Sequence, residues 1–119
     1  MSERTYHGSC HCGAVRFRFT SEPIKDACRC NCSICRRKSA VMSDVYFPPE
    51  SFVLEPTDQL ALYQFGDRLV NHYFCRTCGV YTFHEGTEKV GHYRVNLGCV
   101  DEIDDPLALA IRSIDGRSF

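Results

Sequence analysis

The sequence predicts one small, mainly β domain of short antiparallel sheets over residues 1–119. Apolar and polar residues alternate in several short segments, and this period of two is typical of half-buried strands. Turn-forming residues interrupt the chain about every ten residues, so expected strands outnumber expected helices. Nine cysteines, most of them in close clusters, could connect such short strands by binding metal ions. These features favour a small sandwich or a barrel-like pair of sheets.

The expected strands follow one another between turns. The first covers 14–20, where Val15, Phe17 and Phe19 alternate with polar residues. Further strands are expected at 43–47, 60–65, 70–74, 80–83 and 92–97, with a short apolar piece at 51–54. A short helical turn is expected at 36–40, whereas 107–112 is too short to assign to a strand or to a helix.

The charge balance of the chain argues against two classes of partner. Fourteen basic and fifteen acidic residues give a net charge of −1, whereas nucleic-acid and membrane binding usually require a basic excess. No apolar run approaches the roughly 20 residues of a membrane span. Residues 1–7 are polar and lack the apolar centre of a secretory signal. We therefore expect no nucleic-acid partner and no membrane association.

The nine cysteines indicate metal binding rather than disulfides. Their number is odd, no export signal precedes them, and they stand in knuckle-like clusters. Thiols that bind metal are typical of a reducing compartment, so the expected location is the cytoplasm.

Two outer pairs of cysteines predict one closed zinc site. Cys10 and Cys12 are followed by a glycine, and so are Cys75 and Cys78. Such glycines allow the positive φ that tight metal-binding turns often need. Structural zinc takes four tetrahedral ligands, so neither pair closes a site alone, but together they supply four thiolates. This zinc would tie the first strand to a hairpin far away in the sequence.

The central cluster predicts a different kind of site. Cys30, Cys32 and Cys35 form a compact unit of three ligands with one position left open, as in catalytic zinc sites. In an extended segment Cys28 and Cys32 would lie about 13 Å apart, too far for one zinc ion to reach both. The alternatives are that Cys28 bends back as a fourth ligand, or that a histidine closes the site. The candidate histidines are His72, His84 and His92.

Several neighbours of these clusters have two interpretations. Arg29, Arg36 and Arg37 could attract an anionic substrate, offset the charge of three thiolates, or form an ordinary solvated surface. Cys99 has no partner at ligand spacing and is expected to be a small buried residue. His11 is expected to face solvent. An iron–sulfur cluster is disfavoured because the cysteines separate into two sets.

Three motifs of the chain resemble a known family. The segments 8–17, 30–37 and 74–79 resemble, in order and spacing, the glutathione-dependent formaldehyde-activating enzyme family, which is shared with centromere protein V. The resemblance covers nearly the whole chain and implies an all-β, tent-like fold with two zinc ions. It implies a structural zinc on Cys10, Cys12, Cys75 and Cys78 and a catalytic zinc on Cys30, Cys32 and Cys35.

The resemblance also implies an activity. The family is named for combining formaldehyde with glutathione to give S-hydroxymethylglutathione, and it is classed among the carbon–sulfur lyases. We therefore expect a zinc-dependent lyase that forms or cleaves an adduct between a small thiol such as glutathione and a small aldehyde such as formaldehyde. The alternative is a non-catalytic interaction domain whose second zinc site is closed by Cys28. A third interpretation gives Cys28 and Cys99 a redox or metal-buffering role.

Overall fold

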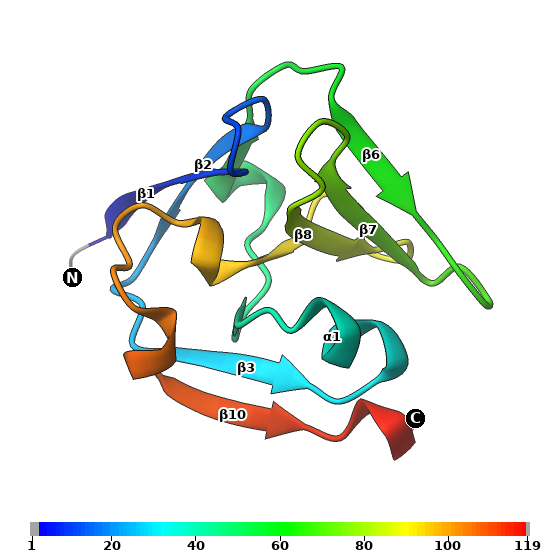
Figure 1. Ribbon diagram of the computed structural model, residues 1–119. Helices are drawn as coiled ribbons and strands as arrows, with labels where there is room; N and C mark the ends of the chain where they lie inside the picture. The colour runs from blue at the N-terminus through cyan, green and yellow to red at the C-terminus, as the bar shows by residue number, and fades with distance from the viewer. Residues whose placement is uncertain (1–2, 119) are drawn as a thin grey trace.

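The computed structural model describes residues 3–118, so Met1, Ser2 and Phe119 at the ends of the predicted domain lie outside the described residues. Three small sheets and one short helix make up the molecule (Figure 1). The predicted mainly β fold is confirmed. The first sheet has the order β1-β2-β5, with β1 (Arg4–Ser9), β2 (Arg16–Ser21) and β5 (Phe52–Leu54).

The second sheet has the order β6-β7-β8-β9, with β6 (Leu60–Tyr63), β7 (Val70–Cys75), β8 (Tyr81–Gly86) and β9 (Tyr93–Val95). The third has the order β10-β3-β4, with β3 (Asp26–Cys30), β4 (Met42–Ser43) and β10 (Ala110–Ile114). The helix α1 (Ser33–Lys38) lies between β3 and the β7–β8 hairpin (Figure 1). Short 3-10 turns occur at Pro49–Ser51, Leu97–Cys99, Pro106–Ala108 and Gly116–Ser118.

The first two sheets pack together through aromatic side chains. Phe17 and Phe19 on β2 are 2% and 1% exposed, as expected for the alternating pattern of that strand. The ring of Phe17 packs edge to face on that of Phe83 of β8, with 5.3 Å between the ring centres. The ring centres of Phe52 of β5 and Tyr93 of β9 are 4.5 Å apart. Burial of each such side chain is worth about 1.5–3 kcal/mol. This aromatic core fixes β1, and the turn that follows it, against the β7–β8 hairpin.

Strand β1 was not predicted from the sequence because a glycine occupies one of its inward-facing positions. Tyr6 and Gly8 face inward, and a Cβ at Gly8 would lie 2.3 Å from the ring of Phe17. The close approach of that ring requires a residue without a side chain. The strand therefore shows only one inward apolar side chain in its sequence, too few for a pattern of period two.

The sequence predicts antiparallel sheets, but the third sheet contains one parallel pair of strands. Strands β3 and β10 run parallel, with Ala27 opposite Ile111 and Cys30 opposite Ile114. The residues between these strands form most of the rest of the domain, a connection long enough for parallel pairing. The segment 107–112, left unassigned from sequence, contains the end of a 3-10 turn and the start of β10. Asp105 begins that turn by accepting a hydrogen bond from the backbone N–H of Leu107 at 3.1 Å.

Two other expected elements are shifted. Of the segment expected as a strand at 43–47, Ser43 belongs to β4 and Phe47 forms an isolated bridge with Tyr93, whereas Val45 and Tyr46 between them are exposed. The helical turn expected at 36–40 begins earlier, directly after Cys32. No helix within residues 3–118 is long and apolar enough to cross a bilayer.

Candidate metal centres

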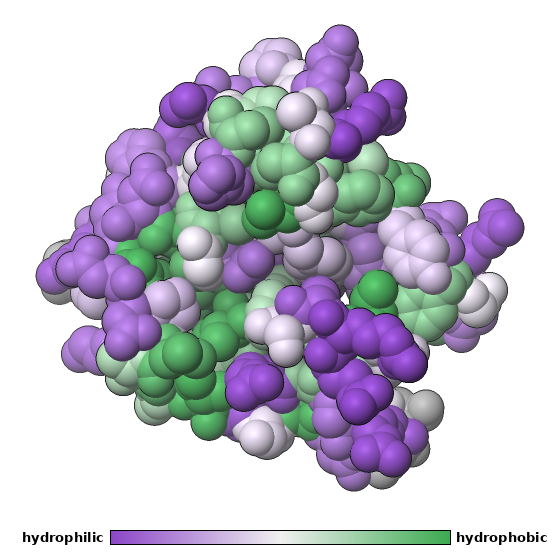
Figure 2. Space-filling model, viewed as in Figure 1, coloured by the Kyte–Doolittle hydropathy of each residue, from purple (hydrophilic) through white to green (hydrophobic). Residues whose placement is uncertain are grey.

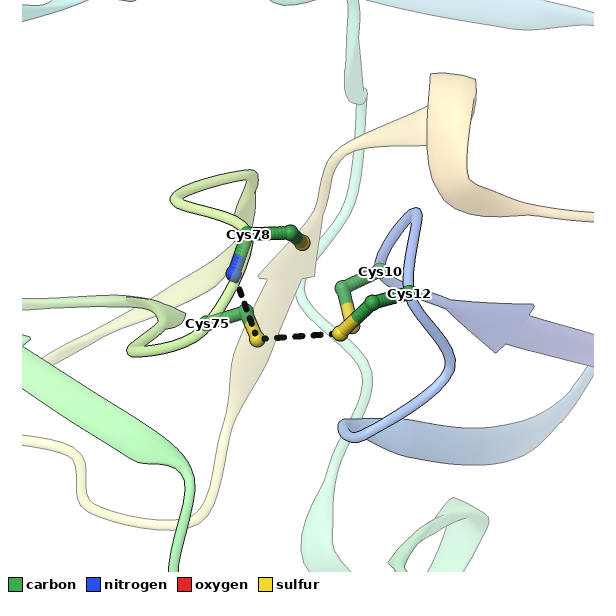
Figure 3. Close-up of side chains that lie close together, drawn as sticks. All are labelled: Cys10, Cys12, Cys75 and Cys78. Atoms are coloured by element: carbon green, nitrogen blue, oxygen red, sulfur yellow. Dashed lines mark hydrogen bonds between the residues drawn. The ribbon is translucent and has the colours of Figure 1, made fainter.

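The four outer cysteines converge. Figure 3 shows Cys10 and Cys12, on the turn after β1, facing Cys75 and Cys78, on the turn between β7 and β8. The four sulfurs lie within 4.8 Å of one another, and Cys12 Sγ is 3.7 Å from both Cys10 Sγ and Cys75 Sγ. Tetrahedral zinc with Zn–S bonds of about 2.3 Å places its sulfur ligands about 3.8 Å apart. This set of donors therefore fits one zinc ion.

The two turns that carry these thiols are built alike. The backbone N–H of Cys10 donates to the carbonyl of Val15 at 3.0 Å, and that of Cys75 donates to the carbonyl of Val80 at 3.0 Å. The glycine that follows each pair has a positive φ, 84° in the first turn and 79° in the second, as the sequence predicts. The same local geometry thus occurs at two distant points of the chain, and the aromatic core brings them together.

Backbone hydrogen bonds favour the thiolate form at this site. The N–H of Val15 donates to Cys10 Sγ at 3.3 Å, and although burial opposes it, this bond and the neighbouring thiols lower the pKa of Cys10. The backbone N–H groups of Cys12 and Val80 lower the pKa of Cys78 to about 6. Since zinc binds thiolates, these turns are prepared for a metal ion.

The central thiols also converge, and the chain turns as the sequence argument requires. The sulfurs of Cys30, Cys32 and Cys35 lie within 4.8 Å of one another. Cys30 ends β3, Cys32 directly precedes α1, and Cys35 lies in the first turn of that helix. All three are half-buried. Burial raises the pKa of Cys32, but hydrogen bonds from the backbone of Cys35 and from the neighbouring thiols lower it overall.

Cys28 does not join this group. It is 2% exposed, and its thiol donates to the carbonyl of Ser43 on β4 at 3.5 Å. Burial raises the pKa of Cys28, which disfavours a free thiolate. Within residues 3–118, neither Cys28 nor any of the three candidate histidines belongs to the cluster of converging metal donors. The central set therefore consists of three thiols.

The C-terminal segment packs against these thiols, a contact that the sequence did not reveal. A Cβ at Gly116 would lie 2.4 Å from Cys30 Sγ. Asn31 holds the segment in place: its backbone N–H donates to the carbonyl of Ile114 at 3.1 Å, and its side chain accepts from the N–H of Arg117 at 3.0 Å. Residues on both sides of Gly116 are thus fixed against the metal-binding turn.

A polar cluster lies between Lys38 of α1 and the β7–β8 hairpin. The ammonium of Lys38 lies 3.8 Å above the centre of the Tyr81 ring, a cation–π contact. The Tyr81 hydroxyl lies 2.6 Å from His72 Nδ1 and 3.0 Å from His84 Nδ1. His84 Nε2 is in turn 3.1 Å from the hydroxyl of Tyr46.

Both histidines of this cluster are uncharged near neutral pH. Burial and, to a smaller extent, the charge of Lys38 lower the pKa of His72 to about 4. The same two causes lower the pKa of His84 further. Burial, followed by the negative charge of Cys35, raises the pKa of Tyr81.

The sequence offered His72 and His84 only as alternative fourth ligands and could not place them beside each other. A regular hairpin that pairs Phe74 with Tyr81 would place His72 opposite Phe83. A bulge between Tyr73 and Phe74 shifts the register, so that His72 lies opposite His84. Such a bulge has no clear sequence signal, and only the hairpin itself was predictable.

Arginines lie near the central thiols. Arg29 and Arg36 line a surface hollow of about 370 Å³, together with Cys30 and the acidic Asp115. A second hollow of about 330 Å³ is lined by Arg36, Arg37 and Arg117. Figure 2 shows hydrophilic residues gathered over α1 and the C-terminal end of the chain. The positive surface considered from sequence therefore lies at the three-thiol site.

Two further sequence expectations agree with the structure. Cys99 is buried and lies outside both groups of converging thiols, with its sulfur 3.6 Å from the carbonyl oxygen of Tyr81. His11 is exposed although it lies between two cysteines of the first turn. All nine cysteines are free of disulfides.

Comparison with known proteins identifies the family of this chain. The model of the glutathione-dependent formaldehyde-activating enzyme family matches residues 5–112. The chain belongs to this family. A crystal structure of a Rhodobacter sphaeroides protein is similar at 35% sequence identity with a TM-score of 0.75, covering 88% of this chain and 97% of that one.

A curated relative agrees with this membership over a shorter stretch. A Halomonas elongata protein, provisionally named glutathione-dependent formaldehyde-activating enzyme, is 63% identical over 30 residues. That match covers 25% of this chain and 19% of the relative. The family predicted from the cysteine motifs is confirmed.

Proposed function

We propose that this protein is a zinc-dependent carbon–sulfur lyase that forms or cleaves an adduct between a small thiol, such as glutathione, and a small aldehyde, such as formaldehyde. The observation that carries the proposal is the converging three-thiol set, one member of which, Cys30, is among the residues that line a surface hollow. Three protein ligands and one free position are typical of catalytic zinc. The family's name supports the same pair of substrates.

The two clusters would hold two zinc ions with different roles. Cys10, Cys12, Cys75 and Cys78 would hold a structural zinc, and Cys30, Cys32 and Cys35 a catalytic one. The catalytic zinc would lower the pKa of a thiol substrate so that it reacts as a thiolate. The chain's own residues would then bind, orient and protonate the reacting groups.

The arginines beside Cys30 suit an anionic thiol. Glutathione carries two carboxylates, and guanidinium groups bind carboxylates through paired hydrogen bonds. Arg29 and Arg36 line the same hollow as Cys30, and both are exposed. Because the whole chain has a net charge of −1, this positive surface is a local feature that would attract an anion to the thiol site.

The alternative of a closed, non-catalytic second site has no support in the position of Cys28. Its thiol is bound to the carbonyl of Ser43, away from the three converging thiols.

Nine free thiols also suit a reducing compartment, and we propose a cytoplasmic location.

The decisive experiment combines metal stoichiometry with X-ray absorption at the zinc edge, with and without glutathione. We expect two zincs per chain in the wild type and in Cys28→Ala, and one additional sulfur at one zinc when glutathione is present. Cys35→Ser, as the matched variant, should lose the second zinc alone. If Cys28→Ala loses one zinc and glutathione changes neither spectrum, the open site and the proposed activity are both wrong.

A further inference from the structure

The ammonium of Lys38 is buried without a polar partner. Within residues 3–118 its Nζ makes no hydrogen bond and no salt bridge, and it lies over the face of the Tyr81 ring. Burial lowers the pKa of Lys38, and the negative charges of the three central thiols oppose this shift. A buried cation without a hydrogen bond is costly. Its position is therefore explained best by a partner that the chain does not supply.

A second buried nitrogen close to the same tyrosine also has no partner. His72 Nδ1 is bound to the Tyr81 hydroxyl, but His72 Nε2 is buried with no hydrogen bond. The ring of Phe65 stacks on His72 at 5.7 Å and also lines a hollow of about 310 Å³ beside α1. The two side chains that carry the unpartnered nitrogens thus both contact Tyr81, Lys38 through the ring face and His72 through its other nitrogen.

His72 is the inner end of a continuous chain of hydrogen bonds. The order is Tyr46, His84, Tyr81, His72, with distances of 3.1, 3.0 and 2.6 Å. A neutral imidazole donates through one nitrogen and accepts through the other, and a hydroxyl donates one hydrogen. The three hydrogen bonds can therefore all point toward His72, or they can all point toward Tyr46. Tyr46 is 41% exposed, so this series of hydrogen bonds leads from a residue at the surface to the buried His72 Nε2.

We propose that Lys38 binds the carbonyl oxygen of the aldehyde, and that the chain from Tyr46 to His72 supplies the proton which this oxygen takes up. The inference rests on the proposed function and assigns the aldehyde side of the same site. Lys38 lies three residues after Cys35 on α1, a spacing that places both side chains on one face of the helix. The oxygen-binding cation is thereby fixed next to the thiols by a single short helix.

The proton balance of the reaction is complete. The thiolate sulfur attacks the aldehyde carbon, a C–S bond forms, and the π pair of the carbonyl moves onto the oxygen beside Lys38. His72 Nε2 gives its proton to this oxygen while His72 Nδ1 takes one from Tyr81. Tyr81 is reprotonated by His84, His84 by Tyr46, and Tyr46 by water. The chain then donates in the opposite direction, which leaves His72 Nε2 ready to accept the proton during cleavage.

Binding measurements test the role of Lys38 without relying on turnover. Calorimetry would compare three ligands: glutathione, S-methylglutathione, and S-hydroxymethylglutathione kept intact by excess formaldehyde. In the wild type the hydroxymethyl adduct should bind about tenfold more tightly than the methyl thioether, because only the adduct has an oxygen for the ammonium. Lys38→Met should abolish this difference and leave glutathione affinity and two zincs per chain unchanged. Lys89→Met, at an exposed lysine, is the matched control.

The chain of hydrogen bonds is tested by removing one hydroxyl. Tyr81→Phe keeps the ring beneath Lys38 but separates the two histidines, and we expect kcat for adduct formation to fall about 100-fold, as for loss of a general acid. Small protonated buffers should restore part of the rate in this variant and not in the wild type. Tyr63→Phe, which removes an exposed hydroxyl, should behave as the wild type.

Two failures can be told apart. A wild type that binds no glutathione and makes no adduct overturns the proposed function itself. An active wild type overturns only the present inference if Lys38→Met keeps the preference for the hydroxymethyl adduct, or if Tyr81→Phe keeps its rate. Lys38→Gln provides a second test if methionine disturbs the zinc content.

Discussion

The two cysteine clusters use the same ligand chemistry for different ends. The outer cluster has four thiols on two similar turns, and Cys10 and Cys75 are buried. The central cluster has three thiols, all half-buried, beside an exposed arginine surface and a buried ammonium. The outer set joins two distant parts of the chain, whereas the central set lies within one short turn. The difference supports the proposal that fold stability depends on the first site and reactivity on the second.

The largest expected effect comes from breaking the outer site. Cys75→Ser removes a buried ligand that connects β7 to the turn after β1, and we expect loss of the cooperative fold. Structural zinc contributes about 10–16 kcal/mol in small zinc-binding peptides, which matches the total stability of a typical domain, about 5–15 kcal/mol. Circular dichroism and thermal melting measure the change. A variant that melts cooperatively near the wild-type temperature would contradict the structural role.

The matched change at the central site should separate activity from stability. Cys32→Ser should lower the rate of adduct formation at least about 100-fold, since the site would lose both a ligand and its metal. Its melting temperature should stay near that of the wild type, because this turn joins only neighbouring segments. Assaying the two cysteine variants side by side tests the comparison directly. Equal losses of stability in both would show that the two sites do not differ in role.

A smaller effect is expected at Gly116, where a side chain would collide with Cys30 Sγ. Gly116→Ala should weaken zinc binding at the central site and destabilise the C-terminal turn by about 1–3 kcal/mol, as for an overpacked contact. Gly86→Ala is the control, because a Cβ there meets nothing nearer than 3.9 Å. Competition with a chromophoric zinc chelator measures the affinity of the weaker site. Equal affinities in the two variants would show that the C-terminal turn is not packed against Cys30.

The smallest effect is a shift in titration beside the central site. With its pKa lowered to about 4, His72 should stay neutral from pH 8 to pH 5. An unfolded histidine titrates near 6.5, so the stability due to neutral His72 is complete above that pH and is lost as the pH falls toward 4. Two-dimensional NMR of the imidazole, with His72→Gln to assign the signal, measures this pKa. Titration near 6.5 would contradict the burial of this ring.

The sequence by itself determined which cysteines form each of the two converging groups. Cysteine spacing selected the four outer and three central thiols, because ligand spacing within a turn is a local property of the chain. Alternation in β2 likewise predicted a strand, since Phe17 and Phe19 face one core. The family followed from the same motifs.

Only the tertiary structure decided what surrounds the central thiols. The bulge in the β7–β8 hairpin pairs His72 with His84, and the parallel pairing of β3 with β10 brings Gly116 against Cys30. It also decided that Cys28, two residues from Cys30, faces Ser43 instead of the metal site. These placements depend on strand register and on contacts between segments far apart in the chain, where a shift of one residue exchanges the faces of a strand. Local sequence patterns do not encode such a shift, so the neighbours of the thiols became visible only in the folded molecule.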